Sequence, residues 1–242
     1  MRHARSLVGI SFVLWAATAA HASFAAYNDF GGTDSGYDGG NVTAFTASAG
    51  GELIDYDTGE SVGVTMSLST AIDPAGGALT EGTPAYDYFY GRVNVDGYMY
   101  HDYKHPYTIT FTGLDPNKTY EVVLFGDEGA EGLETMNVYQ ILSADSFDNE
   151  SSGTISGDNN EIATMNVGYN SLTGYVAHYT NIQPGADGDF MIRIRAGGED
   201  GIWCLNALRL STHAPEPSSL ALLGIGGMVL LRRRPPVLKA GG

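Results

Sequence analysis

The chain has 242 residues, with 28 acidic against 12 basic side chains and a formal net charge of −16 at pH 7. Residues 23–214 hold 27 acidic and six basic residues, a formal net charge of −21. This balance argues against nucleic acid as a partner, since phosphate binding requires clustered Lys and Arg. Divalent cations and neutral sugars remain compatible with it, as does a charge that keeps an exported protein soluble. The one cysteine, Cys204, excludes an intrachain disulfide and is expected to be a small buried apolar residue.

The first 22 residues have the three parts of a secretory signal peptide. A basic start precedes an apolar run over residues 7–17, and small residues follow at Ala20 and Ala22. We predict that signal peptidase cleaves between Ala22 and Ser23. A membrane-anchoring helix is the alternative, but the apolar run is short for a hydrocarbon core of about 30 Å.

Residues 23–212 are predicted to form one all-β domain, a β-sandwich. Aromatic residues, β-branched residues and Gly are frequent, whereas helical repeats of Ala, Leu, Lys and Glu are missing. Apolar and polar residues alternate as in half-buried strands, which need two sheets to bury them. The predicted strands cover residues 62–68, 107–111, 120–125, 135–141, 174–179 and 190–195.

A strand, a corner and a strand are predicted over residues 107–126, with turn-forming residues at 113–118. Tyr120 follows the corner and is expected to hold it through its hydroxyl. Together with later segments, this unit resembles domains of the galactose-binding-like jelly-roll type over roughly half the chain. The resemblance implies that residues 206–210 return beside the first strand. Such folds host sugar binding, adhesion and accessory roles, so function stays open.

Tyrosines are densest over residues 86–107, interleaved with carboxylates. Aromatic faces pack on the C–H side of a sugar, and carboxylates bind its hydroxyls, so this mixture predicts a saccharide site. The alternative is that these tyrosines are strand residues that pack in or cover the sandwich. The candidate ligand-binding residues are Tyr86, Tyr88, Tyr90, Tyr98, Tyr100 and Asp102.

Asp55, Asp57 and Glu60 place carboxylates at short intervals beside a Gly turn, as a hard cation such as Ca²⁺ prefers. Structural calcium is one prediction, and carboxylates of a solvated turn are the alternative. No cofactor is required by any motif. His101 and His105 have metal-ligand spacing, but no third ligand accompanies them. Catalytic motifs of hydrolases, P-loop proteins and zinc peptidases do not occur, so we predict that the protein is not an enzyme.

Residues 213–242 combine a Pro-Glu-Pro motif, an uncharged apolar stretch over residues 218–231 and three arginines. As a helix the stretch would span only about 21 Å, which is marginal for a permanent transmembrane helix. The arginines are expected on the cytoplasmic side, which leaves the domain outside. The motif residues are Pro215, Glu216, Pro217, Arg232, Arg233 and Arg234.

This order of elements resembles the PEP-CTERM sorting tail of Gram-negative bacteria. The resemblance implies that an exosortase, an integral-membrane enzyme, recognises Pro-Glu-Pro and processes the protein on its way to the cell surface. An ordinary tail anchor after a Pro-containing linker is the alternative.

The sequence therefore predicts an exported protein, held in the inner membrane transiently or permanently and then presented at the cell surface or outside the cell. Its expected partners are signal peptidase, an exosortase-type enzyme, the inner membrane through the C-terminal helix, and exopolysaccharide, which it would bind or embed in. A secreted hydrolase of polysaccharides and a purely structural envelope protein are the alternatives.

Overall fold

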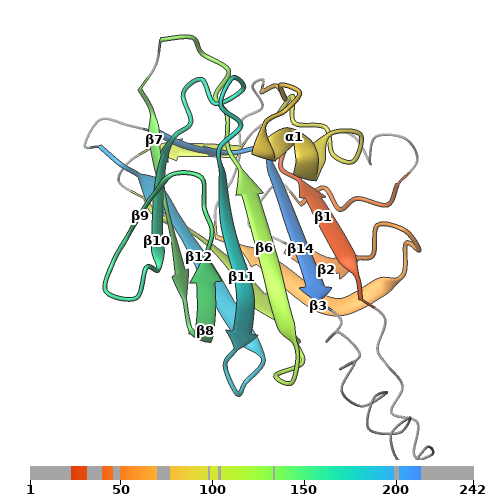
Figure 1. The fold of residues 1–242 in the computed structure, drawn as a ribbon. Helices are drawn as coiled ribbons and strands as arrows, with labels where there is room; N and C mark the ends of the chain where they lie inside the picture. The colour runs from red at the N-terminus through yellow and green to blue at the C-terminus, as the bar shows by residue number, and fades with distance from the viewer. Residues whose placement is uncertain are drawn as a thin grey trace, which may run out of the picture.

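In a computed structural model the described residues form a two-sheet β-sandwich with one short helix (Figure 1). The predicted signal peptide and the predicted helix over residues 218–231 lie outside the residues that the structure describes. Within the described part, no helix is both long enough and apolar enough to cross a membrane. The described residues are 23–31, 40–45, 50–69, 77–97, 99–102, 105–132, 134–198 and 202–213.

One sheet has five antiparallel strands in the order β1-β14-β6-β11-β8. The predicted return of the last strand beside the first is confirmed, because β14 pairs with β1 and places Ser211 opposite Ala25. The strands are β1 (Ala25–Asp29), β14 (Ala207–His213), β6 (Thr119–Phe125), β11 (Val176–Pro184) and β8 (Ala144–Asn149).

The other sheet has seven strands in the order β2-β3-β5-β12-β7-β10-β9. The six predicted strands overlap β3, β5, β6, β7, β11 and β12, and the all-β sandwich fits a jelly roll. The strands are β2 (Gly50–Ile54), β3 (Ser61–Leu68), β5 (Tyr107–Thr112), β12 (Asp189–Ala196), β7 (Met136–Leu142), β10 (Ile162–Asn166) and β9 (Thr154–Ser156). A small separate sheet pairs β4 (Met99–Asp102) with β13 (Ile202–Leu205).

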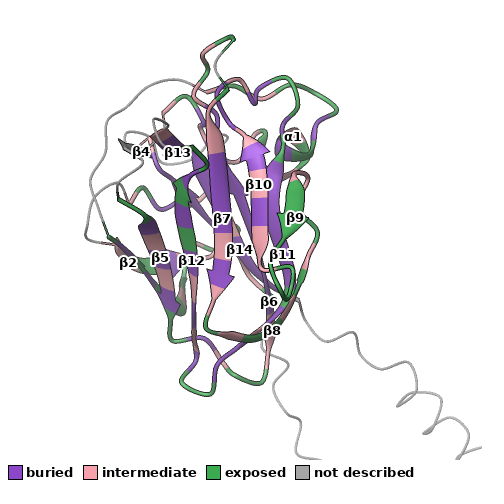
Figure 2. Ribbon diagram, turned by 90° about the vertical axis from the view of Figure 1, so that its left-hand side faces the viewer, coloured by how far each residue is buried: buried purple, intermediate pink, exposed green. Residues whose placement is uncertain are grey.

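The main core lies between the two large sheets. Buried and more exposed residues alternate along β10 and β12, as strands with one inward face require (Figure 2). Phe190 of β12 packs on Phe111 of β5, with ring centroids 4.8 Å apart. Cys204 is fully buried, as the sequence predicted, and burial raises the pKa of its thiol.

A second, smaller apolar cluster lies on the outer face of the five-stranded sheet, under helix α1 (Pro84–Phe89). Thr83 caps this helix by accepting a hydrogen bond from the Tyr86 backbone N–H, and Pro84 suits its first turn. Phe89 packs on Phe125 of β6 at 6.3 Å. The alternative that these tyrosines are strand residues does not hold for residues 84–89, because they form a helix that covers the sheet.

The two ends of the described domain lie side by side at one pole of the sandwich. β1 begins and β14 ends there (Figure 1), and the backbone N–H of Phe24 donates to Thr212 Oγ1 at 3.1 Å. Helix α1 lies at the opposite pole, where it covers the other ends of β6 and β11. We call the end with Phe24 and Thr212 the proximal pole and the end with α1 the distal pole.

The predicted tyrosine corner is confirmed. The hydroxyl of Tyr120 accepts a hydrogen bond from the Asp115 backbone N–H at 2.7 Å, and the Asp115 side chain accepts one from the Asn117 backbone N–H at 2.9 Å. The turn between β5 and β6 is thus held by one hydroxyl from the following strand. Tyr107 differs, because its buried hydroxyl has no hydrogen-bond partner among the described residues.

We expect Tyr120→Phe to lower the free energy of unfolding by about 1 kcal/mol, because it leaves the turn amide without its acceptor. Tyr107→Phe is the matched control. It removes a buried hydroxyl that is not hydrogen-bonded, and should leave stability unchanged or raise it. Chemical denaturation of the mature protein measures both; equal losses in the two variants would contradict the role given to Tyr120.

Candidate functional site

The structure divides the predicted tyrosine cluster between two environments. The rings of Tyr86 and Tyr90 stack on each other, 4.2 Å apart at an interplanar angle of 14°, and Tyr90 is 58% exposed. Tyr88, on the same helix, faces the sheet instead, with its ring 5.4 Å from that of His178. Tyr86 lies on α1 and Tyr90 is the residue that caps its C-terminal end, so the stacked rings lie together on the outer side of the helix. Tyr98 lies outside the described residues, and β4 carries Tyr100 and Asp102 opposite Cys204 and Ile202 of β13.

A small cleft of about 170 Å³, which we call the distal cleft, lies beside the exposed ring of Tyr90. Most of its walls are apolar, and Asn94 and Asp96 bring an amide and a carboxylate to it. It is smaller than pockets for drug-sized ligands, which suits a single sugar unit rather than a whole cofactor. The lining residues are Ala78, Leu79, Tyr90, Gly91, Val93, Asn94, Val95 and Asp96.

Further exposed apolar side chains flank the same helix. Leu172 is 62% exposed and Tyr175 is 39% exposed, and both belong to the loop that leads into β11. This loop is joined to the start of α1, since the Ala85 backbone N–H donates to the Gly174 carbonyl at 2.9 Å. We call the distal cleft together with Tyr86, Tyr90, Leu172 and Tyr175 the distal surface.

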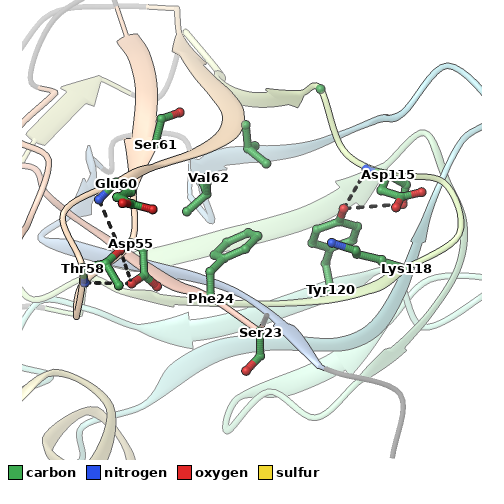
Figure 3. A pocket seen from close by; sticks show the side chains of 12 residues that line it. Ser23, Phe24, Asp55, Thr58, Glu60, Ser61, Val62, Asp115, Lys118 and Tyr120 are labelled. Atoms are coloured by element: carbon green, nitrogen blue, oxygen red, sulfur yellow. Dashed lines mark hydrogen bonds between the residues drawn. The ribbon is translucent and has the colours of Figure 1, made fainter. Parts of the chain in front are cut away.

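A larger pocket of about 430 Å³ lies at the proximal pole (Figure 3). The ring of Phe24 lies between Asp55 of the β2–β3 hairpin and Tyr120, and Lys118 extends beside Tyr120. A neighbouring pocket of about 410 Å³ shares Phe24 and Asp55 and adds Asp57. Both pockets also include Ser23, the residue after the predicted cleavage site.

The carboxylate of Asp55, a predicted calcium ligand, holds its own hairpin together. One oxygen accepts hydrogen bonds from the Thr58 backbone N–H and hydroxyl, each at 2.9 Å, and the other accepts from the Ala25 backbone N–H at 3.2 Å. Among the described residues, no group of three or more His, Cys, Asp or Glu side chains is arranged to hold a metal ion. Calcium at Asp55, Asp57 and Glu60 stays a prediction, and this geometry is that of a hydrogen-bonded turn.

An ionic cluster that the sequence did not reveal lies on the outer face of the five-stranded sheet. Glu121 of β6 lies 2.7 Å from Nε2 of His178 on β11 and 2.9 Å from the guanidinium of Arg209 on β14. The hydroxyl of Ser211 donates to the same carboxylate at 3.0 Å. The guanidinium carbon of Arg209 lies 5.7 Å from the ring centroid of Tyr88, so the cluster also supports α1 from below.

Glu121 is held ionised by this cluster. Burial opposes its ionisation, but hydrogen bonds from His178 and Ser211 and the charge of Arg209 outweigh burial and lower its pKa to about 2. A carboxylate that holds three donors is a poor general acid at neutral pH. The cluster therefore acts as a structural brace between strands and helix.

Comparison with known proteins adds one finding, at the C-terminal end. Residues 213–234 match a family model described as the PEP-CTERM protein-sorting motif. The chain carries a PEP-CTERM sorting motif. The match shows export to the cell envelope with processing by an exosortase, as the sequence resemblance implied. No curated protein and no solved structure matches the chain, so the galactose-binding-like resemblance stays a prediction.

The PEP-CTERM motif begins where the sandwich ends. Its matched span starts at His213, the last residue of β14, which lies at the proximal pole beside the start of β1. The distal surface lies at the other end of these strands. A domain attached to a membrane or a processing enzyme through this tail therefore has its distal surface on the side away from the attachment.

The depressed pKa of Glu121 gives a testable dependence of stability on pH. A carboxyl whose pKa is about 2 in the folded state and 4.5 otherwise contributes stability above about pH 4.5 and loses it as the pH falls toward 2. We expect Glu121→Gln to lower the free energy of unfolding by about 2 kcal/mol at pH 7. The difference from the unsubstituted protein should shrink steadily below pH 4.5.

Glu150→Gln is the control for that experiment, because Glu150 lies 3.8 Å from the same histidine but its side chain is 59% exposed. Exposed pairs contribute little, so we expect less than about 0.5 kcal/mol. Denaturant titrations between pH 2 and 7 measure both variants. A Glu121→Gln deficit that is independent of pH would contradict the assignment.

Proposed function

We propose that this exosortase-sorted protein is a non-enzymatic component of the cell surface or extracellular matrix that binds exopolysaccharide through its distal surface. One observation carries the proposal: an exposed tyrosine, Tyr90, whose ring stacks on that of Tyr86, lines a cleft at the pole opposite the sorting tail. We also propose that residues 218–231 hold the protein in the inner membrane until the tail is processed.

The chemistry of the distal cleft suits a sugar. The exposed ring of Tyr90 offers a flat apolar face for the C–H side of a pyranose, and Val93 and Val95 add apolar side chains to the walls. Asn94 and Asp96 bring polar atoms to the same cleft, where hydroxyl groups need partners. An apolar cleft with few polar groups binds a single sugar unit weakly. A polymer with repeated units offsets this low affinity through multivalency.

Charge favours a saccharide without carboxylate or sulfate groups. The carboxylates of Glu81 and Asp87 lie near Tyr86, and Asp96 lines the cleft itself. Arg92 lies next to the cleft-lining Gly91, but its guanidinium already donates to the backbone carbonyl of Asp87 at 2.9 Å. A hydrogen bond to a neutral carbonyl leaves the guanidinium charged, so an acidic polymer would meet three carboxylates against the one cation of Arg92.

The hydrolase alternative has less support at this surface. Hydrolysis of a glycosidic bond normally uses two carboxyl groups about 5–10 Å apart across the bond. Asp96 is the one carboxylate among the residues that line the distal cleft. This lining favours binding without cleavage.

We expect Tyr90→Ala to weaken binding to a neutral polysaccharide by about tenfold or more, because it removes the aromatic platform. Lys118→Ala, in the proximal pocket, is the control and should leave affinity unchanged. Affinity electrophoresis against neutral, amino-sugar and uronate polymers, including the producer's own exopolysaccharide, measures the effect. Absence of binding to every polymer, or loss of binding in Lys118→Ala alone, would contradict the proposal.

Processing at both ends is expected to show in the intact mass of the native protein. The mass should correspond to a chain that starts at Ser23 and has lost the segment with Arg232 to Arg234. Glu216→Ala should cause a heavier form that retains the tail to accumulate, because it removes the charged centre of the Pro-Glu-Pro motif. A native mass that includes the arginines would overturn processing of the tail.

A further inference from the structure

The two walls of the distal cleft contain no regular secondary structure, yet both are tied to one pair of buried polar residues. One wall is residues 78–79, which follow Gly77, and the other is residues 93–96; Tyr90 and Gly91 complete the lining. Asp127 and Asn206, which hold the two walls, are both fully buried. We propose that Asp127 and Asn206 are positioning residues that set the spacing of the distal cleft. As a statement about ligand binding, this inference rests on the proposed function.

Asp127 holds the first wall. It lies two residues beyond the end of β6, and one oxygen of its carboxylate accepts a hydrogen bond from the Ala78 backbone N–H at 3.1 Å. The other oxygen accepts from the backbone N–H groups of Asn170 at 2.7 Å and Gly129 at 3.2 Å. Backbone N–H groups from three loop residues thus donate to one carboxylate.

Asn206 holds the second wall. Its side-chain amide donates to the Val95 carbonyl at 2.9 Å, and its side-chain oxygen accepts from the Asp127 backbone N–H at 2.7 Å. Asn206 itself is fixed between β13 and β14, where its backbone N–H donates to the Phe125 carbonyl at 2.8 Å. Both walls are therefore hydrogen-bonded to residues that are themselves hydrogen-bonded to each other, Asp127 and Asn206.

Gly77, just before the first wall, lies too close to Asn206 and Val95 for any side chain. A Cβ atom at Gly77 would lie 2.4 Å from the amide nitrogen of Asn206 and 2.8 Å from the Val95 oxygen. Glycine is therefore required where the chain passes over the hydrogen bond that holds the opposite wall. The contact brings the two walls together without a strand between them.

The carboxylate of Asp127 is also linked, through Asn170, to Tyr175 of the distal surface. Asn170, which donates its backbone N–H to Asp127, also accepts from the Tyr175 backbone N–H and donates to the Tyr175 carbonyl, each at 2.8 Å. Burial raises the pKa of Asp127, so keeping a carboxylate here is costly. The buried carboxylate holds loops that carry exposed residues in a fixed arrangement.

Hydrogen–deuterium exchange of the full mature protein tests this role without a ligand. Asn206→Ala and Asp127→Asn should speed exchange in peptides covering residues 77–97 by about tenfold, the effect of one lost buried hydrogen bond. Asp127→Asn should also speed exchange over residues 168–175. Each rate is compared with the change in global stability measured by denaturation.

Asn137→Ala is the matched control. Asn137 is an equally buried asparagine whose amide donates to the Tyr139 hydroxyl and the Cys204 carbonyl, so its side-chain hydrogen bonds go to strands rather than to the walls. We expect it to alter exchange over residues 77–97 only as far as global stability changes. Equal acceleration in all three variants, or none in Asn206→Ala and Asp127→Asn, would overturn the positioning role.

Binding to a neutral polysaccharide separates this inference from the proposed function. If the unsubstituted protein binds, Asn206→Ala should weaken binding about tenfold while Asn137→Ala does not. Retained affinity in Asn206→Ala would show that the cleft spacing does not matter for recognition. If the unsubstituted protein binds no polysaccharide, the proposed function fails, and hydrogen exchange still decides whether the two residues position the walls.

Discussion

The antiparallel pairing of β1 with β14 determines the layout of this protein. It places the first and last strands of the sandwich next to each other, so the chain enters and leaves at the proximal pole. The sorting motif starts at the end of β14, and the helix and loops of the distal pole are directed away from it. A connection that ended β14 at the other pole would place the exposed Tyr90 beside the sorting tail.

The outer face of the five-stranded sheet depends on this same order of strands. Its distal half is apolar and is covered by α1, which packs on Val123 and Phe125. Its proximal half carries the carboxylate of Glu121 between partners from β11 and β14, its two neighbours in the sheet. Tyr88 joins the halves, since it belongs to the helix and contacts the ionic cluster. One helix face is therefore used for attachment, and the other displays the tyrosine pair.

Three of the buried polar residues fix loops. Asp127, Asn170 and Asn206 satisfy backbone groups from segments that have no ladder partners of their own. The strands need no such help, because their backbone hydrogen bonds are made within the sheets. Rigid loops on a stable sandwich are a common way to present a binding surface.

The sequence by itself determined the sorting motif, the fold class and six of the fourteen strands that the structure describes. Export signals, alternating strand patterns and the Tyr120 corner depend on residues that are close together in the chain, so local reading detects them. It also marked Tyr86 and Tyr90, but not that a Thr-Pro start makes their segment helical and directs Tyr88 to the other side. Only the tertiary structure joined Glu121 with His178 and Arg209, and Asp127 with Asn206, because pairs separated by about 60 to 90 residues meet only once strand order and register are established.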